Sequence, residues 1–347
     1  MKKIVAALLF LVILVSAFSI LASADVIIQN NNGEDVNMTE LFEARSFTSS
    51  KGTKINYRIY FPKNYDPEKK YPLILFLHGV GQRGNDNQSQ LKLGICEPFK
   101  NPNSEIYNCI VIAPQCPSND KWINIPGEGW DLYCSYDSTK ITESASTAAV
   151  VELVRNVRDE EAVDDNRMYI TGLSMGGFGT WDILVRHPRL FTAAMPLCGG
   201  ADYRKASVIK DIPIWTFHGQ QDQTVPCEGT ERMVAELEKI GGNITYTPYP
   251  ESGHGIWVEV YARDDIFPWL LSQKFSDRFP DEYEDYTDEP EDPIDPEPVA
   301  PITTEPATDP KKKNSSCKST VEGIVPAVLT VSAAAFALRK KKKKDEQ

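Results

Sequence analysis

The sequence predicts an α/β domain in which a mainly parallel sheet is covered by helices on both faces. Apolar, strand-like segments alternate along the chain with segments of helical periodicity, an order that favours this class. Several short motifs with chemically active side chains follow directly after strand-like segments. Ligands of such folds bind at the carboxyl ends of the strands, so the positions of these motifs support the same class.

The expected strands are rich in β-branched and aromatic residues and are bounded by turn residues. They cover residues 42–47, 55–61, 73–77, 106–113, 168–171, 191–197, 212–217 and 244–249. Segment 55–61 alternates apolar and polar residues, which predicts a half-exposed edge strand. Segment 73–77 is apolar throughout, which predicts a central strand covered on both faces.

The expected helices have apolar residues at helical spacing and end at proline or glycine. They cover residues 144–158, 177–187, 228–240 and, for the most part, 256–271. In the first, Ala148, Val151 and Val154 recur on one face. Pro188 stops the second, and the glycine pair 241–242 closes the third. These helices complete the alternation that an α/β fold requires.

The two ends of the chain differ in composition from the globular domain expected over 37–275. Residues 1–24 have a basic start, an apolar run and an Ala-x-Ala site, which is typical of a secretory signal peptide; an uncleaved anchor is the alternative. Residues 276–313 are acidic and rich in proline, which predicts a disordered spacer. Residues 321–344 pair an apolar segment with a basic cluster, which predicts a C-terminal membrane anchor rather than an amphipathic tail. This order predicts a domain tethered outside the cell.

The charge and the cysteine pattern of the sequence bear on nucleic-acid binding, metal binding and disulfides. The net charge is −12 and the domain has no basic stripe, which excludes nucleic-acid binding. No C-x₂-C or H-E-x-x-H spacing occurs, so we expect neither a metal nor another cofactor. Cysteines stand at 96, 109, 116, 134, 198 and 227 of the domain. Export permits disulfides among them, and Cys198 with Cys227 is the favoured pair because each follows an expected strand.

The run from Gly172 to Gly176 is the central motif of the sequence. It reads Gly-Leu-Ser-Met-Gly, with an expected strand before it and an expected helix after it. This is the pattern of a nucleophile elbow, in which a sharp turn projects one serine into the site and small residues allow the turn. We therefore expect Ser174 to be the nucleophile of an α/β-hydrolase, the alternative being a glycine-rich structural turn.

A serine nucleophile needs a base and an orienting acid, which follow it along the chain in α/β-hydrolases as acid and then histidine. His254 lies in a flexible glycine-containing loop after the last expected strand and is the predicted general base. His218 ends a strand and is expected to be structural. Asp222 lies just beyond that strand and is the predicted acid, with Asp202 as its rival.

The oxyanion hole and the substrate cleft are expected around the same serine. The N–H of Met175, which follows the nucleophile, is the first expected donor, and the N–H of Val80 in the loop after 73–77 is the second. His78 opens that loop and is expected to shape it rather than to act as a base. Trp130 and Trp257 are candidates for lining the cleft, with core packing as the equal alternative.

Seven short motifs between residues 77 and 257 contain these candidate residues or lie near them, within a similarity that covers about residues 45–271, nearly the whole domain. They are LHGVGQRGNDN at 77–87, IAPQCP at 112–117, YITGLSMGGFGTWD at 169–182, CGG at 198–200, PIWTFHG at 213–219, DQTVP at 222–226 and GHGIW at 253–257. Together they resemble the secreted bacterial phospholipase/carboxylesterase-like proteins, often labelled predicted peptidases. The resemblance implies an α/β-hydrolase fold, serine esterase activity and the same triad. The family is also similar to feruloyl and acetyl-xylan esterases and to polyhydroxyalkanoate depolymerases.

These observations lead to one main expectation about function and two alternatives. We expect an extracellular serine carboxylesterase acting through an acyl-serine intermediate. We expect the substrates to be acyl, feruloyl or acetyl esters of plant polysaccharide, because the domain is expected to be exported and tethered and has no long apolar lid. A serine peptidase or a lipid esterase is the enzymatic alternative. An inactive α/β-hydrolase used for binding or adhesion is the other, and an intact triad argues against it.

Overall fold

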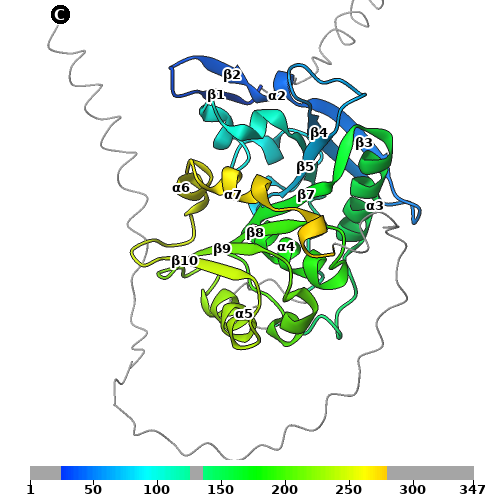
Figure 1. Cartoon of the computed structure of the whole chain (residues 1–347). Coiled ribbons are helices and arrows are strands. Elements are labelled where there is room, and N and C mark those ends of the chain that lie inside the picture. Colours follow the sequence, from blue (N-terminus) through cyan, green and yellow to red (C-terminus); the bar gives the residue numbers. More distant parts are fainter. Residues whose placement is uncertain (1–24, 126–135, 280–347) are drawn as a thin grey trace, which may run out of the picture. The chain divides into compact units, whose positions relative to one another are not determined.

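The computed structural model describes residues 25–125 and 136–279, all within one compact unit (Figure 1). The predicted signal peptide, nearly all of the predicted spacer, the predicted anchor and Trp130 lie outside these ranges. Within them, no helix has the length and apolar character that crossing a membrane would require.

The sheet runs through the middle of the molecule. Its described strands are β3 (Glu43–Thr48), β4 (Lys54–Tyr60), β5 (Tyr71–Leu77), β6 (Ile110–Gln115), β7 (Val163–Leu173), β8 (Ala193–Leu197), β9 (Ile214–Gly219) and β10 (Ile244–Tyr249). They lie in the order β10-β9-β8-β7-β5-β6-β4-β3. The strands from β10 to β6 are parallel, whereas β4 and β3 are antiparallel to their neighbours. The α/β class predicted from the sequence is confirmed.

Helices cover the sheet on both faces. They are α2 (Met38–Leu41), α3 (Ala145–Glu160), α4 (Met175–Arg186), α5 (Glu228–Lys239), α6 (Trp257–Tyr261) and α7 (Ile266–Ser272) (Figure 1). Helices α3, α4 and α5 contribute to one buried core, and α2, α6 and α7 to the other. Strand β5 explains the division, because Leu73 and Leu75 point into the first core while Ile74 and Phe76 point into the second.

Two expected strands differ from the observed ones. The alternating segment 55–61 is not the edge of the sheet, because β3 pairs along its outer side from Glu43 to Thr48. The residues at the start of segment 106–113 form the short helix η4 (Glu105–Asn108), and β6 begins only at Ile110. The Ser104 hydroxyl accepts the N–H of Ile106 and favours this local turn over an extended chain.

The expected helix over 256–271 is two short helices, α6 and α7, rather than one. Between them Arg263 forms an ion pair with Asp265, with 2.6 Å between Nη2 and Oδ2. Helix α3 by contrast begins where its sequence predicts. The Ser144 hydroxyl accepts the N–H of Thr147 at 3.0 Å and so supplies a partner for a first-turn donor.

The favoured disulfide between Cys198 and Cys227 is absent, and both thiols are free. Cys198 directly follows β8 and is fully buried, with its sulfur within 4.8 Å of the ligand atoms of His218 and Asp222. Cys227 stands at the start of α5, where its thiol contacts the side chain of Glu231. The prediction was wrong because the two side chains point to different partners although both follow strands at the same edge of the sheet.

Candidate active site

The turn at Ser174 joins β7 directly to α4. Ser174 has φ of 55° and ψ of −119°, a conformation that L-residues rarely adopt. The flanking glycines make the turn sterically feasible. A Cβ on Gly176 would lie 1.9 Å from the Leu77 carbonyl oxygen, and one on Gly172 would lie 2.4 Å from the Gly176 carbonyl oxygen. The strand, the turn and the helix therefore project the Ser174 side chain from the carboxyl end of the sheet.

The structure brings Ser174, His254 and Asp222 together at this edge. His254 Nε2 lies 2.8 Å from Ser174 Oγ, and His254 Nδ1 lies 2.6 Å from Asp222 Oδ2. The three residues come from three different connections: the β7–α4 turn, the loop after β9 and the loop after β10. Ser174 and Asp222 are buried, whereas His254 is partly exposed. This is the geometry of a nucleophile, a base and an orienting acid.

Asp222 is held as a carboxylate by several donors. Its Oδ1 accepts the N–H groups of Thr224 at 2.8 Å and Val225 at 2.9 Å. Burial favours the neutral acid, but hydrogen bonds from His218, His254 and the Val225 N–H outweigh it and hold the pKa of Asp222 well below its usual range. An ionised Asp222 accepts the Nδ1–H of His254, which leaves the Nε2 lone pair directed at the serine hydroxyl.

His218 is also a neighbour of Asp222, a contact that was not among the predictions from the sequence. Its Nε2 lies 3.2 Å from Asp222 Oδ2, and its ring is fully buried. The sequence carries a signal for this contact, because His218 is the last side chain before the strand-ending Gly219 and Asp222 follows four residues later. A turn of that length can return the acid to the end of its own strand.

The loop after β5 approaches Ser174 where an oxyanion hole is expected. A Cβ on Gly79 would lie 3.7 Å from the Cβ of Ser174. Val80 begins the short helix η1 (Val80–Gln82), and Met175 begins α4. First-turn N–H groups have no partner within their helix, and the helix dipole at α4 favours negative charge there. The Met175 side chain is fully buried, so its backbone is the part that is available to a ligand.

His78 shapes this loop through both ring nitrogens. Its Nε2 accepts the N–H of Cys116 at 2.9 Å, so its Nδ1 carries the hydrogen and donates to the Gly79 carbonyl oxygen at 2.6 Å. Burial lowers the pKa of His78 to about 4, which keeps the ring neutral. The Trp122 indole donates to the His78 carbonyl oxygen at 3.0 Å. This supports the predicted structural role of His78.

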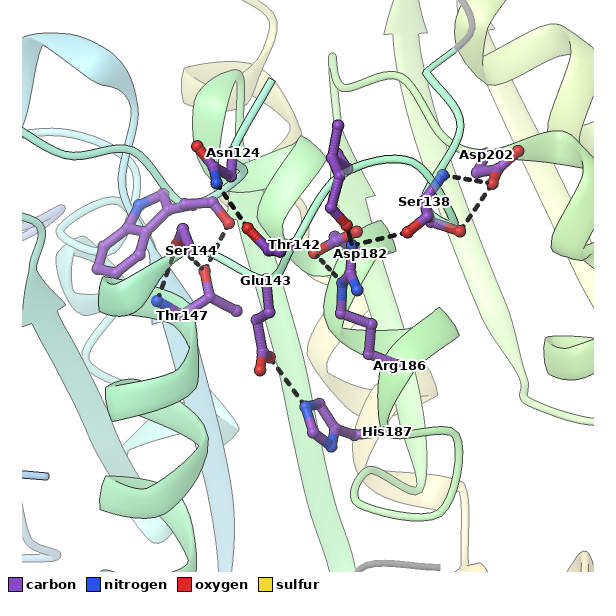
Figure 2. Close-up of polar contacts among 12 residues, drawn as sticks. Asn124, Ser138, Thr142, Glu143, Ser144, Thr147, Asp182, Arg186, His187 and Asp202 are labelled. Carbon is purple, nitrogen blue, oxygen red and sulfur yellow. Dashed lines mark hydrogen bonds and ion pairs between the residues drawn. The ribbon is translucent and has the colours of Figure 1, made fainter. Parts of the chain in front are cut away.

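Asp202, the alternative candidate for the acid, is hydrogen-bonded to Ser138 in the segment before α3 (Figure 2). Its Oδ2 accepts both the N–H of Ser138 at 2.8 Å and the Ser138 hydroxyl at 2.7 Å. Arg186 donates to the Ser138 and Ile141 carbonyl oxygens and is paired with Asp182 on its own helix at 2.8 Å. These contacts fix residues 136–141 against α4, and they leave Asp222 as the acid that contacts His254.

Trp257, at the start of α6, packs its ring edge-on against His254. The ring centroids are 5.0 Å apart and the planes are at 89°. The residue is partly exposed and packs against the core, which agrees with the core-packing alternative, while its place in a substrate cleft stays a prediction. Trp130, the other predicted cleft residue, lies outside the described residues.

Within the described residues, Asp222 also belongs to a cluster of three side chains of the kinds that can bind a metal ion. Donor atoms of Cys198, His218 and Asp222 are within 4.8 Å of one another. The His218 nitrogens and the Asp222 oxygens already have protein partners, namely Thr230, the Val225 backbone and His254. The grouping is therefore a hydrogen-bonded network and not an open set of ligands.

Comparisons with known proteins identify the relatives of this chain. The phospholipase/carboxylesterase family model matches residues 64–263. A probable carboxylesterase of Oryza sativa subsp. japonica is 24% identical and aligns over 53% of this chain and 81% of its own length. A probable feruloyl esterase C of Aspergillus oryzae is 25% identical over 58% of this chain and 68% of its own. A solved structure of a thermostable esterase is 36% identical, with a TM-score of 0.62, over 72% of this chain and 70% of the other.

A bifunctional acetylxylan esterase/xylanase of Neocallimastix patriciarum is 25% identical over 53% of this chain, but the match spans only 24% of that longer protein. The family match, the esterase relatives and the shared fold point to one class of reaction. The chain belongs to the phospholipase/carboxylesterase family of α/β-hydrolases and is a carboxylic ester hydrolase.

Proposed function

We propose that the chain hydrolyses esters through an acyl-enzyme on Ser174. His254 Nε2 takes the Ser174 hydroxyl proton as Oγ attacks the ester carbonyl carbon, and the carbonyl oxygen becomes an oxyanion. The N–H groups of Met175 and Val80 receive that oxyanion. The tetrahedral species collapses, the C–O bond to the alcohol breaks, and His254 returns the proton to the leaving alcohol. Water then attacks the acyl-serine by the same route and releases the acid.

The observation that carries this proposal is the continuous hydrogen-bonded series from Ser174 through His254 to Asp222. The separations of 2.8 Å and 2.6 Å place the base within reach of the hydroxyl and the acid within reach of the base. The strained backbone of Ser174 supports a functional role, because such conformations persist where the surrounding structure enforces them.

Hydrolysis of p-nitrophenyl acetate tests the reaction. Ser174→Ala should lower kcat by roughly 10⁴-fold or more, since no other group replaces the nucleophile. Ser272→Ala is the matched control, because its exposed hydroxyl contacts only the Trp269 carbonyl oxygen and the Gln273 side-chain amide at the end of α7, and it should retain the wild-type rate. Equal rates in the Ser174→Ala variant and the wild type would reject the acyl-serine proposal, and equal rates at the uncatalysed background would favour a non-catalytic binding module.

We further propose that the substrates are acetyl or feruloyl esters of plant polysaccharide. Relatives named as feruloyl and acetylxylan esterases motivate this choice. The partly exposed Trp257 ring beside His254 offers a flat apolar surface to an aromatic acid or a sugar.

Release of acetate or ferulate from xylan, compared with cleavage of phospholipid vesicles and of peptides, tests the substrate class. The proposal expects acid release from xylan at rates well above those on the other two substrates. Trp257→Leu should raise KM for feruloyl esters more than for acetyl esters, because only the former offer an aromatic ring. Activity confined to phospholipid or peptide would reject the polysaccharide assignment while leaving the serine mechanism in place.

We also propose that the domain acts outside the cell, held by its C-terminal tail. This rests on the composition of residues 1–24 and 321–344 and on the acidic spacer that precedes the tail. Cell fractionation of the full chain and of a chain lacking residues 321–347 is the test. The full chain should be recovered with membranes and the shortened chain in the medium, and an equal distribution of both would rule out the anchor.

A further inference from the structure

His218 lies at the end of β9 directly behind the acid of the proposed triad. Its Nε2 is 2.9 Å from the Val225 carbonyl oxygen and 3.2 Å from Asp222 Oδ2. A carbonyl oxygen can only accept, and the ionised Asp222 carboxylate can also only accept. His218 Nε2 therefore carries a hydrogen, which it shares between these two oxygens.

The other ring nitrogen also meets an acceptor. His218 Nδ1 is 2.8 Å from Thr230 Oγ1, and the Thr230 hydroxyl donates to the Gly199 carbonyl oxygen at 2.7 Å. A hydroxyl has one hydrogen. If Thr230 turned it toward a bare Nδ1, its oxygen would face the Gly199 oxygen at 2.7 Å with no hydrogen between them. The contacts are satisfied together only if His218 Nδ1 donates to Thr230.

The charges around the ring are compatible with this arrangement. Asp222 faces Nε2, and the Cys198 thiol lies within 4.8 Å of both groups. Burial raises the pKa of Cys198, so that thiol stays neutral and adds no charge. His254 reaches the same Asp222 oxygen from the opposite loop. One buried cation and one buried carboxylate then balance each other, as buried charges require.

We propose that His218 carries hydrogens on both ring nitrogens and is a positioning residue for Asp222. The inference rests on the proposed function, and it explains why the His218 ring is buried beside Asp222. As a fixed cation beside Asp222, His218 offsets part of the attraction of the carboxylate for the protonated form of His254. The base then stays neutral, and able to accept the Ser174 proton, to a lower pH than it would beside an unbalanced carboxylate.

Nitrogen-15 NMR of the histidine-labelled protein tests the protonation directly. The two His218 ring nitrogens should both give signals typical of N–H in an imidazolium, with His218→Gln or Thr230→Val identifying them by loss or shift. One protonated and one bare nitrogen would overturn the inference. The spectrum of the wild-type protein decides this point even where His218→Gln does not fold, because Thr230→Val provides the assignment.

The pH profile of kcat/KM on p-nitrophenyl acetate tests the effect on the base. In His218→Gln the glutamine amide can still donate to Asp222 but carries no charge, so the acidic limb should move up by roughly 1 pH unit. Thr230→Val removes the acceptor of Nδ1 and should move the limb in the same direction. His187→Gln, which replaces the histidine paired with Glu143 at the end of α4, should leave the limb in place.

An acidic limb that stays in place in both His218→Gln and Thr230→Val would also overturn the inference. The failure of the proposed function has a separate signature. Hydrolysis would then survive Ser174→Ala, while the nitrogen spectrum of His218 would remain informative.

Discussion

Ser174 occupies a backbone conformation that is unfavourable by roughly 1–3 kcal/mol for a non-glycine residue. The sequence indicates this residue because glycines flank it and because Asp222 and then His254 follow it in the order of α/β-hydrolases. The second contact of Asp222, with His218, was not predicted: the four-residue spacing permits it, but the contact depends on how the turn after β9 folds back over its own strand.

The proposed role of the Val80 N–H as an oxyanion donor can be tested by removing that N–H. Gly79 has φ of −76° and ψ of 171°, which is the extended conformation that a following proline requires. Val80→Pro therefore fits the first position of η1 and removes the N–H, and it also replaces the valine side chain. We expect kcat on p-nitrophenyl acetate to fall by about 10²–10³-fold.

Val80→Ala is the matched control for this measurement. It shortens the side chain but keeps the N–H, and its kcat should stay within a few-fold of wild type. A Val80→Pro enzyme with unchanged kcat would mean that the second donor lies elsewhere in the loop.

At the scale of elements, the helix α4 is pressed against β5 and β7 so closely that only glycine fits at the contact. Gly176→Ala would place a Cβ 1.9 Å from the Leu77 carbonyl oxygen, so the strand or the helix has to move. We expect a loss of about 3 kcal/mol in the free energy of unfolding, measured by urea denaturation.

Gly81→Ala provides the comparison, because a Cβ there meets nothing within 4 Å. Its free energy of unfolding should change by less than about 0.5 kcal/mol. Comparable stability of the two variants would show that the elbow is more adaptable than the close contacts imply.

Sequence periodicity predicted the type of nearly every element but not all of their neighbours. The run 73–77 is central, as its continuous apolar character indicates, and lies between β7 and β6. The alternation in 55–61 also gave the correct element, but β3 covers its outer side, and pairing between strands is not encoded in the periodicity of either one. The predicted disulfide between Cys198 and Cys227 was wrong for a similar reason, because two residues near the same edge of a sheet need not point their side chains toward each other.

For the whole molecule, Asp222 links the proposed site to acid stability. Its pKa in the folded chain is held below the unfolded value of about 3.9, so its ionised form stabilises the fold above that value. This stabilisation is lost as the pH falls through the folded-state value. Asp222→Asn should therefore be less stable than wild type by roughly 2 kcal/mol at pH 7, and the difference should shrink steadily below about pH 4.

Urea unfolding at pH 7, 5 and 3 measures this difference. Asp265→Asn is the control, because its carboxylate is exposed in a surface pair with Arg263 and contributes little. A stability difference between Asp222→Asn and wild type that does not change with pH would contradict the assignment of Asp222 as a carboxylate held by its donors.

The central claim is that Ser174 becomes acylated, and covalent trapping tests it most directly. The tryptic peptide from Met168 to Arg186 contains one serine, Ser174. After treatment of the full chain with an organophosphonate ester analogue, we expect mass spectrometry to find one adduct, on Ser174, with hydrolysis lost in proportion. The Ser174→Ala variant should form none. An adduct on another residue, or full labelling of Ser174 with hydrolysis retained, would contradict the account.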